Sequence, residues 1–301
     1  MADVSLSTMW AIDRFAAMPA FVEAARGFGF GLIELNHQVT PDMLQDIATL
    51  YLGSRVAVSS VHAPVPKWDG EGRVPELSAI DEDERRVAVG LVRLTIATAS
   101  RFGAAAVVIH PGRVEVGEDL ERSVRQLYAQ GLATSEQSVA AREELVQVRE
   151  KKRSPYLDAA LVSLRELSEY AAAAGLKLGI ENRYHYYEIP LLDEVQMLLR
   201  ELDASTVFYW HDVGHAHNLE RLGFVRHEAW LRTLSQKILG VHLHDAIGTQ
   251  DHRPAGVGEI DFALVRRFLP RDAIRVCEFD HSASPVEVKA GFEFLRQSGL
   301  F

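Results

Sequence analysis

Eight short apolar runs alternate with longer segments of helical periodicity along the whole chain. The runs are VSLSTMW (4–10), GLIELN (31–36), AVSSVHA (57–63), AAVVIH (105–110), KLGIEN (177–182), VFYWHD (207–212), ILGVHLHD (238–245) and IRVCEF (274–279). Apolar strands that alternate with helices predict a parallel sheet. Eight such units in 301 residues predict an α/β fold, a (β/α)8 barrel in a single domain spanning 1–301. A doubly wound open sheet is the alternative.

One connection is much longer than the others. More than sixty residues, rich in Glu, Arg, Gln and Ala, separate His110 from the strand that begins at Lys177. We expect a helical excursion over 113–170, after the fourth strand, made of two long helices broken near Pro155. It leaves from a strand end, so a solvated excursion and a lid or subunit contact are both open interpretations.

The charge and the single cysteine narrow the setting. With 32 Lys and Arg against 42 Asp and Glu, the formal net charge is −10, which predicts no nucleic-acid partner. The sequence shows no signal-peptide pattern and no apolar run of about 18 residues, so we expect a cytoplasmic protein without membrane contact. Cys277 alone excludes an intramolecular disulfide. A homo-oligomer stays open.

Carboxylates or imidazoles stand at the ends of six predicted strands. In chain order these residues are His62, His110, Glu181, Asp212 with His215, His242 with His244, and Glu278. The C-terminal strand ends of a (β/α)8 barrel share one rim, and the active sites of such barrels lie there. We therefore expect these side chains to converge.

The alternation of side chains along a strand sorts neighbouring residues. If Glu278 points into the barrel, Cys277 points outward, where it is a buried apolar residue and not a nucleophile. The same alternation directs Glu181 and His242 inward. A buried carboxylate needs a cation beside it. Carboxylates and imidazoles that meet at one point are a ligand set for a divalent metal such as Mn²⁺, Zn²⁺, Co²⁺ or Mg²⁺.

These motifs resemble the xylose-isomerase-like barrel superfamily, which includes sugar and sugar phosphate isomerases and epimerases, inosose dehydratases and the endonuclease IV family. SVHAP, VVIHPG, GIENR, HDVGHAH, VHLHD, RPAGVGEIDF and VCEF follow in the family's order over nearly the whole chain. Together these motifs are specific for the superfamily. They do not select one of its reactions.

The resemblance implies a set of site residues. The metal ligands that it implies are Glu181, Asp212, His242 and Glu278. His244 is the alternative to His242 as the third ligand. The resemblance also implies substrate contacts from His215 and Arg253.

The three-zinc site of endonuclease IV extends the resemblance to His62 and His110. An Asp/His pair of that family would fall near Asp251 and His252, but the family's pair is separated by one residue and this pair is adjacent. A third metal is therefore not implied. We expect His62, His110 and His215 to bind substrate or, together with His252, additional metal.

The chemistry that follows is a metal-dependent isomerisation or epimerisation of a sugar or keto-polyol. Glu181 and Glu278 would remove and return the proton alpha to a carbonyl, and the metal would stabilise the enediolate. The loop RYHYYEIP (183–190) offers Glu188 and aromatic side chains to the substrate, and Trp10 and Trp68 are candidate walls. No phosphate-binding loop is visible, which favours a non-phosphorylated substrate.

Three alternatives stay open on the sequence. A keto-sugar or keto-polyol dehydratase shares the proton abstraction and then expels a hydroxyl group. An endonuclease IV-like zinc phosphodiesterase is supported by the extra histidines and opposed by the net acidity. A non-enzymatic binding module would leave the apparent metal ligands without a role.

Overall fold

The structure, a computed structural model, describes residues 4–301. Eight parallel strands close into a barrel in the order β1-β12-β9-β8-β6-β4-β3-β2. They are β1 (Val4–Ser7), β2 (Leu32–Leu35), β3 (Val58–His62), β4 (Ala106–Ile109), β6 (Lys177–Glu181), β8 (Val207–Asp212), β9 (Ile238–Leu243) and β12 (Ile274–Cys277). Each strand lies within one of the eight apolar runs. The predicted barrel is confirmed, and the open sheet is excluded.

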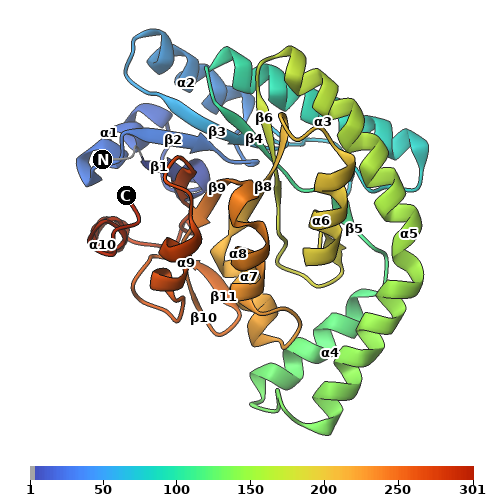
Figure 1. Ribbon diagram of the computed structural model, residues 1–301. Helices are drawn as coiled ribbons and strands as arrows, with labels where there is room; N and C mark the ends of the chain where they lie inside the picture. Colours follow the sequence, from blue (N-terminus) through green and yellow to red (C-terminus); the bar gives the residue numbers. More distant parts are fainter. Residues whose placement is uncertain (1–3) are drawn as a thin grey trace.

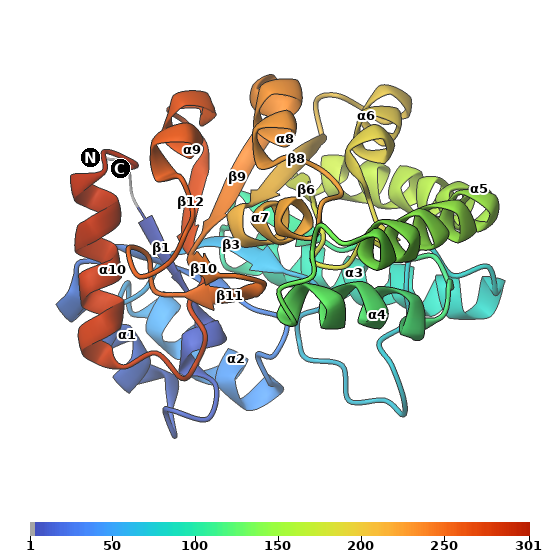
Figure 2. The same cartoon turned by 90° about the horizontal axis from the view of Figure 1, so that it is seen from below.

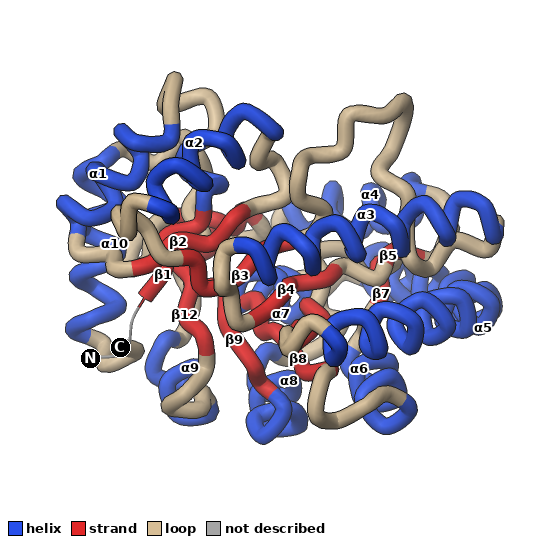
Figure 3. Tube along the Cα trace, turned by 90° about the horizontal axis from the view of Figure 1, so that it is seen from above, coloured by secondary structure: helices blue, strands red, loops and turns tan. Residues whose placement is uncertain are grey.

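Helices surround the strands (Figures 1 and 3). They are α1 (Met18–Phe28), α2 (Pro41–Leu52), α3 (Glu82–Arg101), α4 (Glu118–Ala129), α5 (Glu136–Ala173), α6 (Leu192–Glu201), α7 (Val213–Arg221), α8 (His227–Leu234), α9 (Phe262–Phe268) and α10 (Pro285–Gln297), with short 3-10 helices η1 (Thr8–Ala11) and η2 (Ser235–Lys237). Within residues 4–301, no helix has both the length and the apolar character needed to cross a membrane.

Two short antiparallel pairs lie outside the barrel. One joins β5 (Gly112–Arg113) to β7 (Glu188–Ile189), and the other joins β10 (Asp245–Ile247) to β11 (Gln250–Arg253). The first pair ties the start of the long excursion to the loop after β6. The second forms a hairpin after β9 (Figure 2). Both pairs leave from the C-terminal ends of barrel strands, where the polar residues gather.

The helix ends follow their local sequences. Thr40 accepts a hydrogen bond from the backbone N–H of Met43 and precedes Pro41, so α2 begins with a side-chain cap and a residue preset for the helix. Ser284 and Glu287 form a capping box at α10. Gly29 ends α1 with φ +109°, a left-handed conformation that glycine adopts readily at a helix C-terminus.

The barrel interior is filled around Trp210. Its ring contacts a small apolar layer that includes Val108 and Val276. The neighbouring strands carry glycine beside it: a Cβ at Gly240 would lie 2.3 Å from the ring, and one at Gly179 would lie 2.9 Å away. The two glycines are therefore needed to admit this large side chain.

A second, larger core lies between the barrel and its helices. It includes Leu6, Ile33, Ile180 and Leu243. Cys277 is fully buried in the same layer, where burial raises the pKa of its thiol. The outward orientation predicted for Cys277 is confirmed, and its protonated thiol packs as an apolar group.

The long excursion after β4 is helical, as predicted, but α5 runs through Pro155 without a break. Pro155 is exposed and so is Lys151, the residue whose carbonyl loses its helical partner. Solvent can satisfy that carbonyl, so the proline does not end the helix. The predicted break at Pro155 was wrong.

The two halves of α5 have different environments. Its C-terminal half contributes Leu164 and Leu167 to the core around the barrel. Its N-terminal half and α4 reach beyond the barrel (Figure 1) and pack on a separate cluster that includes Val124, Leu145 and Leu222. This separate cluster allows the excursion to project from the strand-end side.

Trp10 follows the C-terminal end of β1, but its side chain is fully buried. The run 4–10 ends as strand at Ser7 and continues as η1, which turns the indole of Trp10 into the core. The indole N–H donates to the carbonyl of Ala283 at 2.8 Å, and the ring packs against Phe15 and Phe28. The expectation that Trp10 forms a wall of the site was wrong. For Trp68 it stays a prediction.

Candidate metal centre

Four side chains from four strands meet inside the C-terminal end of the barrel. Glu181 and Asp212 are the last residues of β6 and β8, His242 lies in β9, and Glu278 follows β12 directly. Each offers one donor atom, and these four atoms all lie within 4.8 Å of one another. All four residues are buried. They are the four residues that the resemblance implies as metal ligands.

His242 lies at the centre of this group. Its Nδ1 is 2.8 Å from Oε1 of Glu181, 3.3 Å from Oε2 of Glu278 and 3.7 Å from Oδ2 of Asp212. Four ligands at about 2.1 Å around a tetrahedral ion are about 3.4 Å apart. The spacing and the chemistry of these donors therefore fit a divalent cation.

The charges of the group depend on one another. Burial alone would lower the pKa of His242, but Glu278, Glu34 and Glu181 raise it well above its usual value. Burial alone would raise the pKa of Glu181, but His242 and His110 lower it well below its usual value. The pKa of Glu278 is also lowered, against its burial, by His242 and His252. Both carboxylates are thus ionised, and positive charge must balance them.

Glu34 is a fifth member that the sequence reasoning missed. Its Oε1 lies 3.0 Å from Nε2 of His242, and its Oε2 accepts a 2.7 Å hydrogen bond from the hydroxyl of Ser60. Glu34 is fully buried in β2. A charged residue inside the apolar run LIEL is the same signal that drew attention to Glu278, so the sequence did contain a clue.

His62 and His110 form a second group with Glu181. Nε2 of His62 is 3.2 Å from Oε2 of Glu181, and His110 hydrogen-bonds to the same oxygen. One ligand atom of each residue lies within 4.8 Å of the others. Arg183, which sequence reasoning did not single out, also contacts His110. Glu181 therefore links this group to the four-residue group.

A third group joins His215, Asp251 and His252. Asp251 and His252 are adjacent in β11, and neighbours in a regular strand point to opposite faces. His252 has φ +55°, a left-handed conformation that interrupts the regular alternation of the strand. The side chains of Asp251 and His252 can therefore both lie on the side of His215. The adjacency in sequence therefore does not prevent the pair from meeting His215.

His244 has partners at both ring nitrogens. Its Nδ1 accepts a 2.9 Å hydrogen bond from the backbone N–H of His252, and its Nε2 lies 3.0 Å from Oδ2 of Asp212. A backbone donor at Nδ1 places the ring proton on Nε2, where it is donated to Asp212. This arrangement favours His242 over His244 as the third metal ligand.

Asn182 and Asp245 hold the surrounding backbone. Asn182 donates to the carbonyl of Asp212 at 2.9 Å and accepts from its N–H at 2.8 Å, which fixes the end of β8 beside β6. The carboxylate of Asp245 accepts hydrogen bonds from the N–H groups of Gly256, Gly258 and Ile260. These bonds order the segment that follows the hairpin.

The other residues predicted to contact substrate, Glu188, Arg253 and the loop 183–190, lie outside the group of four candidate metal ligands. Glu188 pairs with Arg183 at 2.8 Å. Arg253 is not among the donor groups: it hydrogen-bonds to Gln250 and lines a shallow surface pocket that includes Tyr184 and Asp251. In the loop 183–190, the ring of Tyr184 lies 6.0 Å from that of His215, whereas Tyr186 stacks on Phe224 away from the donors.

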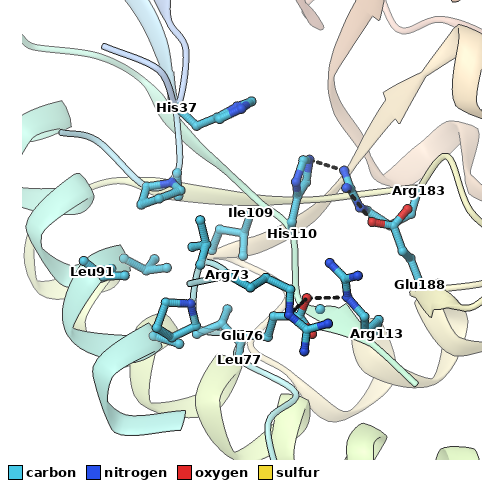
Figure 4. Close-up of a pocket in the computed structure, with 17 residues that line it drawn as sticks. His37, Arg73, Glu76, Leu77, Leu91, Ile109, His110, Arg113, Arg183 and Glu188 are labelled. Atoms are coloured by element: carbon cyan, nitrogen blue, oxygen red, sulfur yellow. Dashed lines mark hydrogen bonds and ion pairs between the residues drawn. The ribbon is translucent and has the colours of Figure 1, made fainter. Parts of the chain in front are cut away.

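A cavity of about 340 Å³ opens beside the donor groups (Figure 4). His37, His110, Arg183 and Glu188 lie at one end, and Leu91 lies opposite them. Because His110 lines the cavity and also contacts Glu181, the cavity lies next to the four-residue group and extends from there toward α3.

Comparison with known proteins agrees with this architecture. Residues 22–298 match the family described as Xylose isomerase-like TIM barrel. A comparison with curated proteins found no match. Among solved structures, a D-tagatose 3-epimerase-like protein has a TM-score of 0.71 at 18% identity, with 99% of this chain and 97% of that chain covered.

Two further structures share the fold. The 3-keto-D-glucoside 4-epimerase YcjR from E. coli has a TM-score of 0.68 at 13% identity, with 99% of this chain and 100% of that chain covered. The IOLI protein with a bound zinc atom has a TM-score of 0.67 at 14% identity, with 99% and 97% covered. Because the family match extends over most of the sequence, the chain belongs to the xylose isomerase-like TIM barrel family.

Proposed function

We propose that this protein is a metal-dependent isomerase or epimerase of a sugar or keto-polyol. The observation that carries the proposal is the convergence of Glu181, Asp212, His242 and Glu278, whose donor atoms lie within 4.8 Å of one another inside the barrel. Structural relatives named as sugar 3-epimerases and as a keto-glucoside epimerase support the reaction class, although at 13% to 18% identity they share the fold alone.

These four residues would hold the metal ion. A divalent cation there supplies Lewis-acid chemistry, because it polarises a substrate carbonyl and stabilises the negative charge that develops as the neighbouring proton leaves. Mn²⁺, Zn²⁺, Co²⁺ and Mg²⁺ are all compatible with three carboxylates and one imidazole.

Glu181 and Glu278 would move the proton. They come from β6 and β12, which are separated in the barrel by β8 and β9, so they approach the centre from different sides. The pKa of each is lowered, so each is ionised at neutral pH, the protonation state that a general base requires. One carboxylate removes the proton alpha to the carbonyl, and the other delivers a proton at a second position or face.

The histidines around the centre would orient the substrate. His62, His110 and His215 lie beside Glu181, each with a ring nitrogen within 4 Å of its carboxylate. Imidazoles at these positions can donate to or accept from sugar hydroxyl groups. Glu188 would hold Arg183 in place through their ion pair.

Incubation with a panel of ketoses and keto-polyols tests the proposal. The protein is loaded in turn with Mn²⁺, Zn²⁺, Co²⁺ or Mg²⁺, and products are separated by chromatography. Conversion of at least one substrate to its isomer or epimer, abolished by chelation and restored by metal, is expected. A product lighter by one water would instead assign a dehydratase.

Phosphodiester hydrolysis is the second candidate. The observation in its favour is the presence of three further groups of candidate ligands. They are His62 with His110 and Glu181, His215 with Asp251 and His252, and His244 with His252 and Glu278. Several ions held together can activate water and stabilise a phosphate. The net charge of −10 opposes binding to a nucleic acid. Three bound metals together with incision of an oligonucleotide containing an abasic site would establish this activity.

A further inference from the structure

The cavity beside the metal centre has two chemically different ends. The end near the donors carries His37, His110 and Arg183. Arg73, Glu76 and Arg113 also line the cavity, and its other lining residues are mainly apolar. These apolar side chains come from the loop after β3, the end of β4, the segment before α3 and α3 itself. They include Pro64, Val74, Leu77, Ala88, Leu91 and Ile109.

The apolar part is poorly suited to a free sugar. A sugar hydroxyl group placed against Ala88 or Leu91 would lose its water without gaining a hydrogen bond, which costs about 1–3 kcal/mol for each group. The same wall suits a substituent without hydroxyl groups, because burial of apolar surface is favourable. The apolar wall therefore suits a substituent attached to a keto-sugar better than it suits the sugar ring itself.

The size of the cavity fits a ring substituent. An apolar cavity of about 150 Å³ accommodates benzene. This cavity measures about 340 Å³, so it can hold one aromatic ring together with the atoms that link it to a sugar. Such a group would extend from the neighbourhood of His110, which contacts Glu181, toward Leu91 on α3 (Figure 4).

The charged residues of the cavity already have partners. Arg113 pairs with Glu76 at 2.6 Å, and Arg183 pairs with Glu188 at 2.8 Å. Arg73 pairs with Glu115 at 2.8 Å. Each guanidinium is balanced by a carboxylate, so the lining does not offer the concentrated positive charge that a phosphate group requires. This balance favours a neutral substituent.

Polar atoms are nevertheless available at the mouth. Within residues 4–301, Nδ1 of His37 and Nε of Arg183 are buried and lack a hydrogen-bond partner. Both residues line the end of the cavity nearest to His110. They stand where the linkage between a sugar and its substituent would pass, and they can bond to an oxygen at that linkage.

We propose that the substrate is a keto-glycoside whose sugar ring lies at the metal centre and whose apolar, aryl-sized substituent fills this cavity. The inference rests on the proposed function and narrows its substrate class from free sugars to glycosides. The sugar ring reacts, while the substituent contributes binding and selectivity. The bond to the substituent is not broken.

Matched pairs of probes test the inference. They are the phenyl and methyl 3-keto-glycosides of D-glucose and of D-galactose, and their affinities for the metal-loaded protein are measured by titration calorimetry. We expect the phenyl member of at least one pair to bind at least ten-fold more tightly than the methyl member. Equal affinities within both pairs, or no binding of either pair, would overturn the inference.

Two substitutions on one helix locate the selectivity. Leu91 lines the cavity, whereas Leu94 lies on the outer face of α3 and is 49% exposed. Leu91→Gln should lower the affinity for the phenyl glycoside at least five-fold and leave that for the methyl glycoside unchanged. Leu94→Gln is the matched control and should change neither. Equal phenyl affinities for the two variants would contradict the assignment of the cavity.

A third substitution protects the test against misfolding. Ala88→Leu fills part of the cavity and should weaken binding of the phenyl glycoside, with the circular dichroism spectrum and metal content retained. The proposed function is judged separately by exchange of the proton alpha to the carbonyl. Phenyl selectivity without exchange would support the cavity assignment and remove the isomerase assignment. Proton exchange without phenyl selectivity would support the isomerase assignment and overturn the cavity assignment.

Discussion

Nε2 of His242 lies 3.0 Å from Oε1 of Glu34. The two residues belong to β9 and β2, which are not neighbours in the barrel, so the contact crosses its interior. A proton on Nε2 donated to Glu34 leaves Nδ1, the nitrogen that faces Glu181, Asp212 and Glu278, free to bind a metal. A carboxylate behind a metal-binding histidine fixes the orientation and basicity of the ring.

Glu34→Gln should weaken metal binding by about 10- to 100-fold. The amide preserves the shape of the side chain but removes the charge that holds the proton on Nε2 of His242. The affinity is measured by titration of the chelator-treated protein with Mn²⁺ or Zn²⁺. Glu23→Gln is the matched control, because Glu23 forms an exposed ion pair with Arg55 and should leave the affinity unchanged. Equal affinities for both variants would exclude a supporting role for Glu34.

Metal binding should release protons and become tighter as pH rises. Before metal binds, the pKa of His242 is raised well above its usual value, so the ring carries two protons at neutral pH. The metal displaces the proton on Nδ1, so affinity should increase from pH 6 to pH 8. Calorimetry in two buffers of different ionisation enthalpy measures the released protons. Identical heats in both buffers would contradict this account.

The raised pKa of His242 predicts that the stability of the metal-free protein falls as pH rises, whereas its affinity for metal increases. A folded-state pKa above the unfolded value stabilises the fold fully below about pH 6.5, and this contribution is lost as pH rises through the raised pKa of His242. The Tm of chelator-treated protein should therefore fall on the alkaline side. Saturating metal should reduce this fall, because the metal replaces the proton.

Arg149→Ala should destabilise the protein by about 3 kcal/mol. Arg149 and Glu194 form a buried ion pair at 2.6 Å, and Arg149 also donates to the carbonyl of Glu188. Truncation of the arginine leaves the carboxylate of Glu194 buried with fewer partners. Urea denaturation monitored by circular dichroism measures the loss.

Arg165→Ala is the control for this substitution. Arg165 pairs with Glu201 at 3.1 Å on the surface, where both side chains are about half exposed, so its loss should cost less than about 1 kcal/mol. Equal losses for the two variants would show that the buried pair adds nothing beyond a surface pair.

The sequence predicted the barrel and the donor groups because both depend on simple periodicities. Each strand lies in a short, mainly apolar run between helical segments, and alternation along the strand predicts which residue at its end faces inward. Alternation along the strands therefore predicts from the sequence alone that Glu181 and Glu278 face the barrel interior and that Cys277 faces outward, where it is fully buried.

Other features depend on tertiary contacts that one sequence does not display. The continuity of α5 at Pro155 follows from an exposed position at which solvent can satisfy a free carbonyl. The meeting of Asp251 and His252 with His215 involves a left-handed backbone at His252 within a short hairpin. The role inferred for Glu34 depends on a contact across the barrel with His242. None of these follows from local propensity.

The central claim is that Glu181 and Glu278 hold a metal and also move a substrate proton. Metal-loaded protein is incubated in D₂O with the panel of ketoses, keto-polyols and keto-glycosides, and deuterium at the position alpha to the carbonyl is followed by NMR. Metal content is determined on the same samples. Glu278→Gln and Glu181→Gln should bind metal more weakly and, with metal restored, should exchange about 10²- to 10⁴-fold more slowly than the unsubstituted protein. Full exchange by metal-loaded Glu278→Gln, or no exchange with any of these substrates by the fully loaded unsubstituted protein, would contradict the claim.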